Sequence, residues 1–262
     1  MAITTLDQLL GAVNQPKSFG KVSATAKGAG TFQSLWTTAG LPTAGVTPTT
    51  AAGVAPTSTT AGAIKFTNPV TGLSYLSKVS STHQTVGTLI LYDRLVHTAA
   101  LNATLTTAQT VNSAALTRNT SGEGVEIFLE FYTATGATAS NVTVSYTNSD
   151  GVAGRTSVSV PMPVTPVAGQ MLPIPLQSGD KGVRSIQSVT LSASTGTAGN
   201  FGITLVERIA EMPVCVAGGG IVLDPFALGL PKIEDNACLA FMVVCSTTST
   251  GFITGTFNIA QG

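Results

Sequence analysis

Residues 124–132 read Gly-Val-Glu-Ile-Phe-Leu-Glu-Phe-Tyr, and this stretch decides the fold class. Every second position from Val125 to Phe131 is apolar, a spacing of two that is typical of a β-strand. Glu126 and Glu130 lie between these positions, which predicts one buried face and one solvated face. Thr is abundant, with 41 of 262 residues, and helix-favouring Lys, Glu and Arg are scarce. The sequence therefore predicts an all-β chain.

The clearest hairpin signal follows in residues 142–160. Apolar and hydroxyl side chains alternate over 142–147, Asn148-Ser149-Asp150-Gly151 supplies turn residues, and the alternation resumes at 156–160. Prolines between 161 and 175 exclude central-strand pairing there and favour an edge or crossing connection. Further strands are predicted at 86–92, 187–193, 201–207, 237–246 and 252–259. Strands that return after long connections predict an antiparallel, jelly-roll-like β-sandwich over residues 86–262.

Residues 1–85 are predicted to form an extended N-terminal arm that starts with a short helix. The leucines after Thr5 share one helical face, and Thr5 with Gln8 fits a capping box. A helix this short is marginal in water, so we expect its apolar face to dock on another surface. Residues 37–63 lack a period, yet aromatic side chains flank them. We expect the arm to contact other subunits, and the predicted interface residues are Leu6, Leu9, Leu10, Phe19, Phe32, Leu35 and Trp36.

The two parts of the chain differ in charge. Residues 1–85 carry five lysines and one aspartate, a net charge of +4, whereas residues 86–262 carry seven basic and eleven acidic side chains, a net charge of −4. The opposite charges would attract the arm to residues 86–262 of the same copy or of another copy. A chance distribution of charges is the alternative.

The overall composition favours an assembled protein. Charged residues make up 9% of the chain, the net charge is zero, and the mean hydropathy is +0.36. A free monomer normally relies on charge for solubility, so we expect subunits to cover one another in a homo-oligomer. No basic face for nucleic acid is expected. The apolar stretches at 213–223 and 237–245 are shorter than the roughly 20 residues that span a bilayer. With no export signal at the N-terminus, we expect cytoplasmic synthesis and no membrane contact.

The candidate catalytic groups do not form a convincing site. Glu126 and Glu130 lie about 13 Å apart along one strand face, wider than the roughly 5–9.5 Å of glycosidase carboxylates. Asp93, Arg94 and His97 cluster near a strand, but no Gly-x-Ser-x-Gly elbow accompanies them. We interpret them as a polar strand terminus and a loop or core histidine. No catalytic residue, cofactor or metal ligand is therefore predicted, and the chain is expected not to be an enzyme.

Three cysteines cannot pair completely within one chain. We expect Cys215, Cys238 and Cys245 to be buried free thiols in a reducing compartment. Cys238 and Cys245 are seven residues apart, so on one strand they would face opposite sides.

Several segments resemble a poorly characterised family of tailed-bacteriophage virion structural proteins. Besides the opening Thr5-Leu6-Asp7, these segments span residues 108–113, 122–125, 145–151, 182–189 and 230–236. The resemblance covers most of the chain but includes no motif of known chemistry. It implies synthesis in the cytoplasm of a bacterial host and incorporation into the virion.

These observations lead to one expected function and two alternatives. We expect a non-enzymatic virion protein, head-associated as a decoration, cement or minor capsid protein, because the chain lacks coiled-coil and fibrous repeats. Its expected partners are copies of itself, with a trimer as one candidate, and the major capsid or other virion proteins. A tail or fibre module that binds a host glycan is the first alternative, and a glycan-degrading enzyme is the second.

Overall fold

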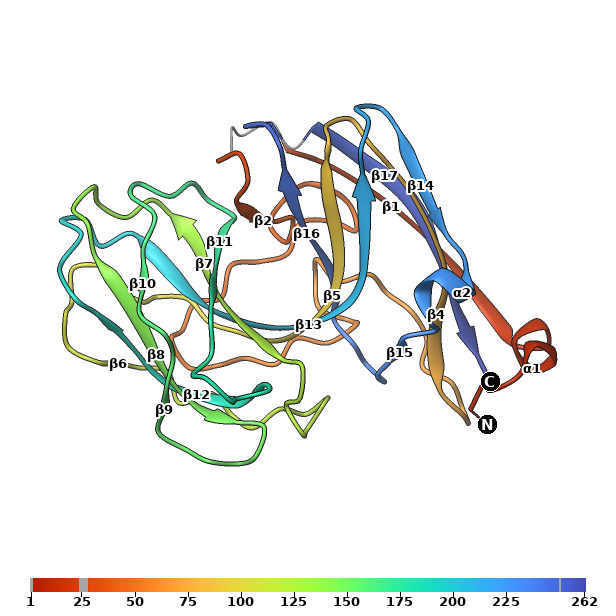
Figure 1. Cartoon of the computed structure of the whole chain (residues 1–262), viewed down its shortest axis with the longest axis horizontal. Coiled ribbons are helices and arrows are strands. Elements are labelled where there is room, and N and C mark those ends of the chain that lie inside the picture. Colours follow the sequence, from red (N-terminus) through yellow and green to blue (C-terminus); the bar gives the residue numbers. More distant parts are fainter. Residues whose placement is uncertain (1, 24–27, 250) are drawn as a thin grey trace.

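A computed structural model describes residues 2–23, 28–249 and 251–262, and almost all regular structure in it is antiparallel β-sheet (Figure 1). Two sheets flank a central closed barrel. This arrangement confirms the predicted all-β, sandwich-type fold class. Within the described ranges no helix is long and apolar enough to cross a membrane.

The first flanking sheet, the β17 sheet, contains both the earliest and the latest strands of the chain. Its order is β14-β4-β17-β1-β3, with β15 beside β4. The strands are β1 (Val13–Ser23), β3 (Gly40–Leu41), β4 (Ser74–His83), β14 (Gly220–Leu223), β15 (Lys232–Ile233) and β17 (Gly251–Gln261). Its inner face packs on barrel strands through a core that includes Phe19, Leu76 and Phe257.

The second flanking sheet, the β8 sheet, lies at the opposite end of the molecule (Figure 1). Its order is β10-β8-β12-β6, with β9 beside β8. The strands are β6 (Gln109–Thr110), β8 (Asn141–Asn148), β9 (Arg155–Thr156), β10 (Val160–Pro161) and β12 (Val183–Leu191). The β8–β9 pair confirms the hairpin that the sequence predicts. Val142, Val144 and Tyr146 point into the core that this sheet shares with one end of the barrel. The sheet and this end of the barrel together are called the β8 lobe.

The barrel joins the two lobes. Its order is β11-β2-β16-β5-β13-β7. The strands are β2 (Phe32–Ser34), β5 (Gly87–His97), β7 (Glu126–Thr133), β11 (Gln170–Ile174), β13 (Asn200–Val214) and β16 (Leu239–Cys245). Alternate residues serve different cores: Leu89 and Leu91 of β5 face the β17 sheet, whereas Ile90 and Tyr92 belong to a third core. Strands with two buried faces read as continuous apolar runs, as β5 does.

Two short helices lie beside the β17 sheet (Figure 1). Helix α1 (Leu6–Leu10) has the predicted capping box between Thr5 and Gln8, and Gly11 ends it. Helix α2 (Pro225–Leu228) is capped by Asp224 and ends at Gly229. None of the residues in either helix is buried.

The sequence predicts an extended arm over residues 1–85, whereas the structure places strands from this range in the β17 sheet and in the barrel. β1 pairs with β17 along its whole length, from Val13 opposite Gln261 to Ser23 opposite Gly251, and β4 pairs with the other side of β17. The sheet therefore continues across the predicted boundary at residue 85. Extended loop remains between β3 and β4, where part of it is buried against the barrel.

The sequence pattern did not predict β1 and β4, for reasons that the structure explains. In β1 the inward positions include a lysine, Lys21, whose ammonium donates to the carbonyl oxygens of Thr38 and Pro42. In β4 a register shift separates the pairs of Leu76 and Lys78 with β17, so Ser77 is an extra residue. Such a bulge spaces the buried Leu76 and Val79 three apart and removes the period of two.

A truncation tests whether β1 belongs to the fold. Deletion of residues 1–36 removes β1 and β2 together with the buried Phe19, Leu35 and Trp36. Each buried side chain of this size contributes roughly 1.5–3 kcal/mol, so we expect the shortened chain to be unfolded by circular dichroism. Leu10→Ser, at an exposed helix position, should leave the spectrum unchanged. A folded truncated chain would contradict this assignment of β1.

Candidate interaction surface and buried polar network

Three of the predicted interface residues lie inside the chain. Phe19, Leu35 and Trp36 are 2%, 2% and 1% exposed. Phe19 packs between Phe241 and Phe257, with ring centroids 4.4 and 6.3 Å away. These three side chains stabilise the subunit itself, and the prediction of contact with a partner is wrong for them.

The other four predicted residues remain partly or fully accessible. Phe32 is half-buried against Phe128, with ring centroids 5.3 Å apart. On α1, Leu6 is 57% and Leu10 73% exposed, and Leu9 is half-buried. Leu6 and Leu9 line a groove of about 200 Å³ that continues onto α2, and contact of these α1 leucines with a partner stays a prediction.

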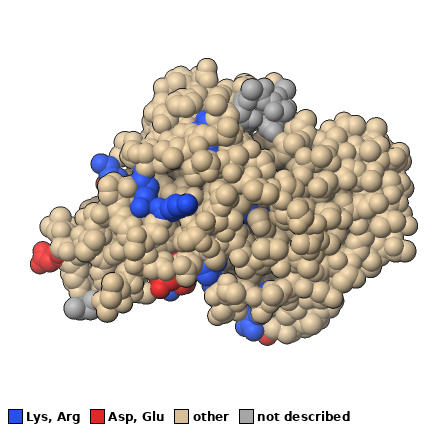
Figure 2. Space-filling model, turned by 180° about the vertical axis from the view of Figure 1, so that it is seen from behind, with Lys and Arg blue, Asp and Glu red and all other residues tan. Residues whose placement is uncertain are grey.

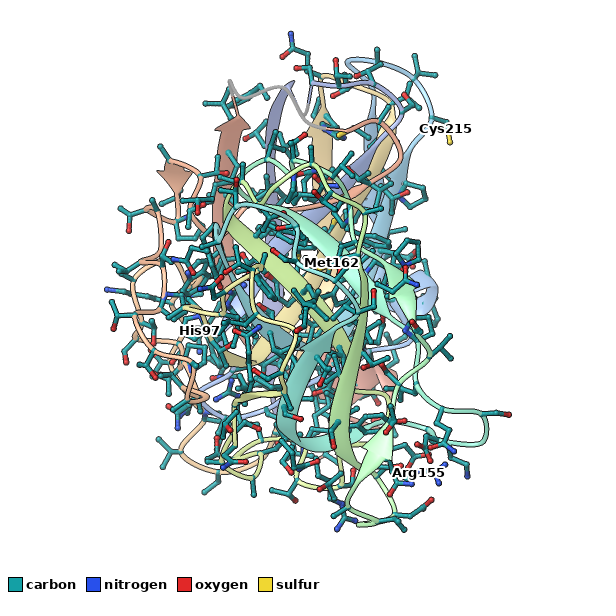
Figure 3. All side chains as sticks on the ribbon, turned by 90° about the vertical axis from the view of Figure 1, so that its left-hand side faces the viewer. His97, Arg155, Met162 and Cys215 are labelled. Carbon is teal, nitrogen blue, oxygen red and sulfur yellow. The ribbon has the colours of Figure 1, made fainter. Side chains whose placement is uncertain are left out.

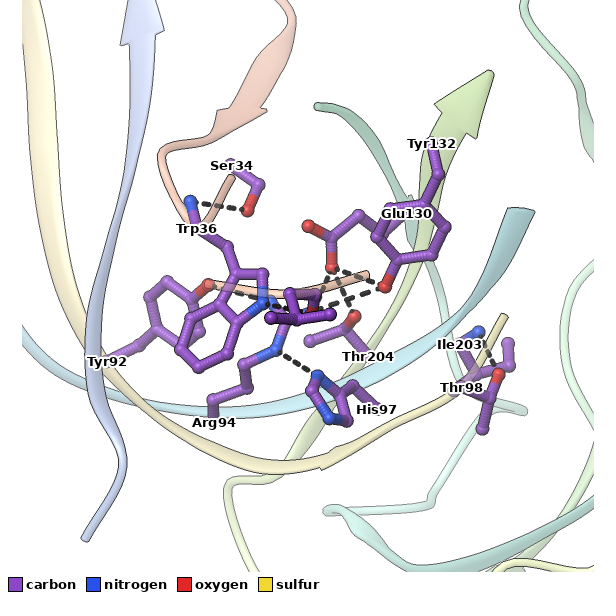
Figure 4. A network of polar contacts seen from close by, with 11 residues as sticks. Ser34, Trp36, Tyr92, Arg94, His97, Thr98, Glu130, Tyr132, Ile203 and Thr204 are labelled. Carbon is purple, nitrogen blue, oxygen red and sulfur yellow. Dashed lines mark hydrogen bonds and ion pairs between the residues drawn. The ribbon is translucent and has the colours of Figure 1, made fainter. Parts of the chain in front are cut away.

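A buried charged network occupies the barrel interior (Figure 4). Arg94 of β5 and Glu130 of β7 form an ion pair, and their side chains are 0% and 1% exposed. Arg94 also donates from Nη2 to the Tyr132 hydroxyl at 3.2 Å and from Nε to Nδ1 of His97 at 2.9 Å. Its guanidinium lies 4.7 Å from the centroid of the Trp36 ring. This contact is a cation–π interaction.

The electrostatics of the network fix one protonation state. Burial opposes ionisation of Glu130, but Arg94 and the hydrogen bond from Thr204 outweigh it, so the pKa of Glu130 lies below its ordinary value. Burial and the charge of Arg94 lower the pKa of His97 to about 3. His97 is therefore neutral at pH 7, and since Nδ1 accepts from Arg94, its proton is on Nε2.

This placement corrects two sequence interpretations. Arg94 lies within a barrel strand, not at a polar strand terminus, and Glu130 lies in the barrel interior, not on a solvated face. Glu126 alone faces the surface, where it pairs with Arg208 at 2.6 Å. His97 is a core histidine, as one of the two sequence interpretations expected. Because Arg94 and Glu130 are sealed from solvent, we assign them a structural role.

A second polar cluster closes the lower end of the β8 lobe, where Figure 3 labels Arg155. Asp180 accepts hydrogen bonds from Arg155 Nε at 2.9 Å, Asn148 Nδ2 at 2.7 Å and the Tyr146 hydroxyl. The bond from Arg155, with those from Tyr146 and Asn148, lowers the pKa of Asp180 to about 2. The ionised carboxylate thus ties the β8–β9 hairpin to the loop before β12.

The cysteines occupy three different environments. Cys238 and Cys245 are buried and belong to different cores, as their predicted opposite orientation requires. Cys215 is exposed, so the expectation that it is buried is wrong; Figure 3 labels it far from Arg155. In the described residues, no group of three or more His, Cys, Asp or Glu side chains is arranged to hold a metal ion.

Away from the Asp180 cluster at its lower end, the outer surface of the β8 lobe is almost free of charge. Four segments, 98–117, 133–149, 156–179 and 185–206, contain no Asp, Glu, Lys or Arg. Figure 2 shows the consequence: the right-hand half of that view, which is the β8 lobe seen from behind, is nearly uniform, and most charged side chains gather over the other half. Apolar side chains are also exposed on this lobe, including Leu105, Val158 and Val164 at 45%, 49% and 56%.

A row of hydroxyl side chains crosses the β8 sheet, whose charged residues are Arg155 of β9 and Arg184 of β12. Thr156, Ser145, Ser188 and Thr110 lie opposite one another on β9, β8, β12 and β6, and all are exposed or half-exposed. The sequence contains a signal for this face, because the outward residues of 142–147 are all hydroxyls and the four uncharged segments can be found by inspection. The pairing of these strands, however, required the structure.

Comparison with known proteins gives little further information. No protein-family profile matches the sequence, and no curated protein sequence matches it. Among solved structures, the VP2 subviral particle of infectious bursal disease virus aligns over 100% of this chain and 83% of that chain, with 11% identity and a TM-score of 0.21. The unassembled VP1 pentamer of KI polyomavirus aligns over 97% and 99%, with 13% identity and a TM-score of 0.18. No conclusion rests on TM-scores this low.

Neutralising the two glutamates separately tests the buried network. Glu130→Gln leaves the Arg94 guanidinium buried without a counter-charge, which should lower the free energy of unfolding by about 3–5 kcal/mol in urea denaturation. Glu126→Gln, in the half-exposed pair with Arg208, should change it by less than about 1 kcal/mol. The double variant Arg94→Met with Glu130→Leu should lower the free energy of unfolding less than Glu130→Gln does, because it leaves no buried charge unpaired. Equal effects of the two glutamine substitutions would contradict the role of Glu130.

The Asp180 cluster predicts how stability depends on acid. Because the pKa of Asp180 is lowered in the folded state, its contribution is complete above its ordinary value of about 3.9 and is lost as the pH falls towards about 2. Asp180→Asn should flatten the stability profile in this window, measured by thermal melts between pH 2 and pH 5. Asp150→Asn, in the neighbouring turn, should keep the wild-type slope.

Proposed function

We propose that this protein is a non-enzymatic structural subunit of a tailed-phage virion, head-associated as a decoration, cement or minor capsid protein. It assembles with copies of itself, with a trimer as one candidate, and with neighbouring capsid proteins after synthesis in the host cytoplasm. The observation that carries the proposal is the uncharged outer surface of the β8 lobe.

This surface has the properties of the central part of a protein interface. Charged residues are depleted at interface cores because their desolvation is costly. On the four uncharged segments of the β8 lobe, only hydroxyl, amide and exposed apolar groups need to be covered, and a partner can satisfy hydroxyls by direct or water-mediated hydrogen bonds. A free monomer depends on surface charge for its solubility, and this surface supplies little charge.

A second contact region is proposed at α1. Leu6 and Leu10 are exposed, and Phe226 on α2 is 83% exposed beside the same groove. Burial of large apolar side chains of this kind stabilises an association by roughly 1.5–3 kcal/mol each. The virion setting is supported by the sequence resemblance to tailed-phage virion proteins, and the head location by the absence of fibrous repeats in the sequence.

A charge placed on the uncharged face tests the proposal. Ser188→Lys puts an ammonium at the centre of a hydroxyl row, and across a symmetric contact it should weaken self-association at least about tenfold in sedimentation velocity. Thr82→Lys, at an exposed position on the β17 sheet, is the matched control and should associate like the wild type. A wild type that stays monomeric at every concentration, or a Ser188→Lys protein that associates normally, would refute the proposed surface.

The location is tested by imaging virions labelled on this protein. Label on the head supports the decoration or minor capsid role. Label confined to the tail would overturn the head assignment in favour of a tail or fibre component, and virions without label would overturn the structural role altogether.

A further inference from the structure

A groove of about 500 Å³ runs along one side of β1, on the opposite side from β17. Pro16, Lys17 and Ser18 of β1 form one wall, and residues 59–65 form the other. Leu41 of β3 closes one end. The surface between the walls carries small apolar side chains, among them the exposed Ala61.

The β1 edge beside the groove is unpaired in the described structure. β3 covers β1 only at Gly20 and Lys21. Towards the start of β1, the loop is held at Thr67: its carbonyl accepts from Gln15 Nε2 at 2.8 Å and from Gln261 Nε2 of β17 at 2.7 Å, and its amide donates to Gln15 Oε1 at 3.0 Å. The edge between Gln15 and the β3 contact spans Pro16 to Phe19, about 10 Å at 3.3 Å per residue.

Two contacts show which backbone groups face the groove. The Phe19 carbonyl accepts from Thr254 of β17 at 3.1 Å, so it points away from the groove. A methyl group on Gly40 of β3 would lie 2.1 Å from the Gly20 carbonyl oxygen, so that oxygen points to the β3 side. Carbonyls alternate along a strand, so those of Pro16 and Ser18 also point to this side. Pro16 has no amide hydrogen, which leaves the Ser18 amide as the donor.

The groove is positively charged. Lys17 and Lys65 extend from opposite walls, and no carboxylate belongs to the residues that line it. Neither lysine forms an ion pair within the described ranges. An occupant that carries carboxylates would complement both walls.

We propose that this groove binds an extended, acidic segment of another virion protein, which adds a strand of about four residues to the edge of β1. The Pro16 and Ser18 carbonyls and the Ser18 amide pair with its backbone. Small apolar side chains of the segment lie on Ala61 and Leu41, and its carboxylates lie beside Lys17 and Lys65.

A second copy of this chain does not fit as well. Its groups of nearby carboxylates are Glu123, Glu126 and Glu130, then Glu207 with Glu211, and Glu234 with Asp235. Glu126 and Glu130 lie on β7, which has β11 and β13 on its two sides, Glu211 already pairs with Arg208 at 2.7 Å, and Glu234 and Asp235 lie in and beside a turn. The observations therefore favour a different chain as the occupant.

The inference rests on the proposed virion role for the identity of the partner, but its test is independent of the β8 surface. The probe is a fluorescein-labelled octapeptide of alternating glutamate and valine, titrated into the full chain and followed by fluorescence anisotropy. Its controls are an octapeptide of alternating lysine and valine and the acidic peptide with two central valines changed to proline. Hydrogen exchange at the Ser18 amide is measured with and without the acidic peptide.

We expect the acidic peptide to bind, the two control peptides not to bind, and the Ser18 amide to become protected. Lys17→Glu and Lys65→Glu should each weaken binding about tenfold, because attraction turns into repulsion. Lys78→Glu makes the same charge change at an exposed site on β4 outside the groove and should leave binding within about twofold of the wild type.

Three results would overturn the groove proposal: no binding of the acidic peptide, equal binding of the proline peptide, or equal loss with Lys78→Glu. If Lys17→Glu instead weakens self-association in sedimentation, the occupant is a second copy and the proposed partner is wrong. None of these outcomes changes the Ser188→Lys test, so a failure of the groove and a failure of the assembly surface are distinguishable.

Discussion

One strand, β13, holds the two lobes of this protein together, and the other elements are arranged around it. It pairs with β7 along residues 200–206 and with β5 along residues 204–214. Its first half therefore belongs to the β8 lobe, and its second half packs under the β17 sheet. Phe201 and Ile203 fill the core of the β8 lobe, and Met212 fills the core under the β17 sheet. Two register shifts against β5, near Leu205 and near Arg208, coincide with this change of core. Bulges of this kind bend a strand and increase its twist, which is what a barrel shared by two sandwiches requires.

Charge is distributed in an unusual way around this framework. The fully buried Arg94 has its counter-charge in Glu130, whereas the surface of the β8 lobe carries hydroxyls where soluble proteins usually have lysine and glutamate. The buried pair is satisfied by Tyr132, His97 and Thr204, so its desolvation is offset by hydrogen bonds from several strands. The lobe surface has no such internal compensation, and a partner subunit is the natural way to cover it. Both the satisfied interior and the uncharged surface are what the proposed structural subunit requires.

The sequence was informative wherever the pleat was regular. Alternation at Val142, Val144 and Tyr146 predicted β8, its turn and the inward face correctly. It failed where pairing broke the period, as at Ser77 in β4, or where an inward position was occupied by Lys21. Aromatic residues such as Trp36 were predicted to contact a partner, and the barrel shows that Trp36 is internal. Glu126 and Glu130 looked equivalent because nothing local distinguishes a barrel interior from a surface. The groove beside β1 depends on the pairing of β3 and on Gln15, neither of which has a sequence signature.

The pairing of β1 with β17 also determines when the protein can fold. β1 leaves the ribosome long before β17, yet β17 is the strand that joins β1 to β4. Until it emerges, the centre of the sheet is missing and the facing edges of β1 and β4 have no neighbour. Contacts between such distant segments form slowly, and unpaired edges favour aggregation in the meantime. The emergence of β17 thus sets the earliest moment at which this sheet can close.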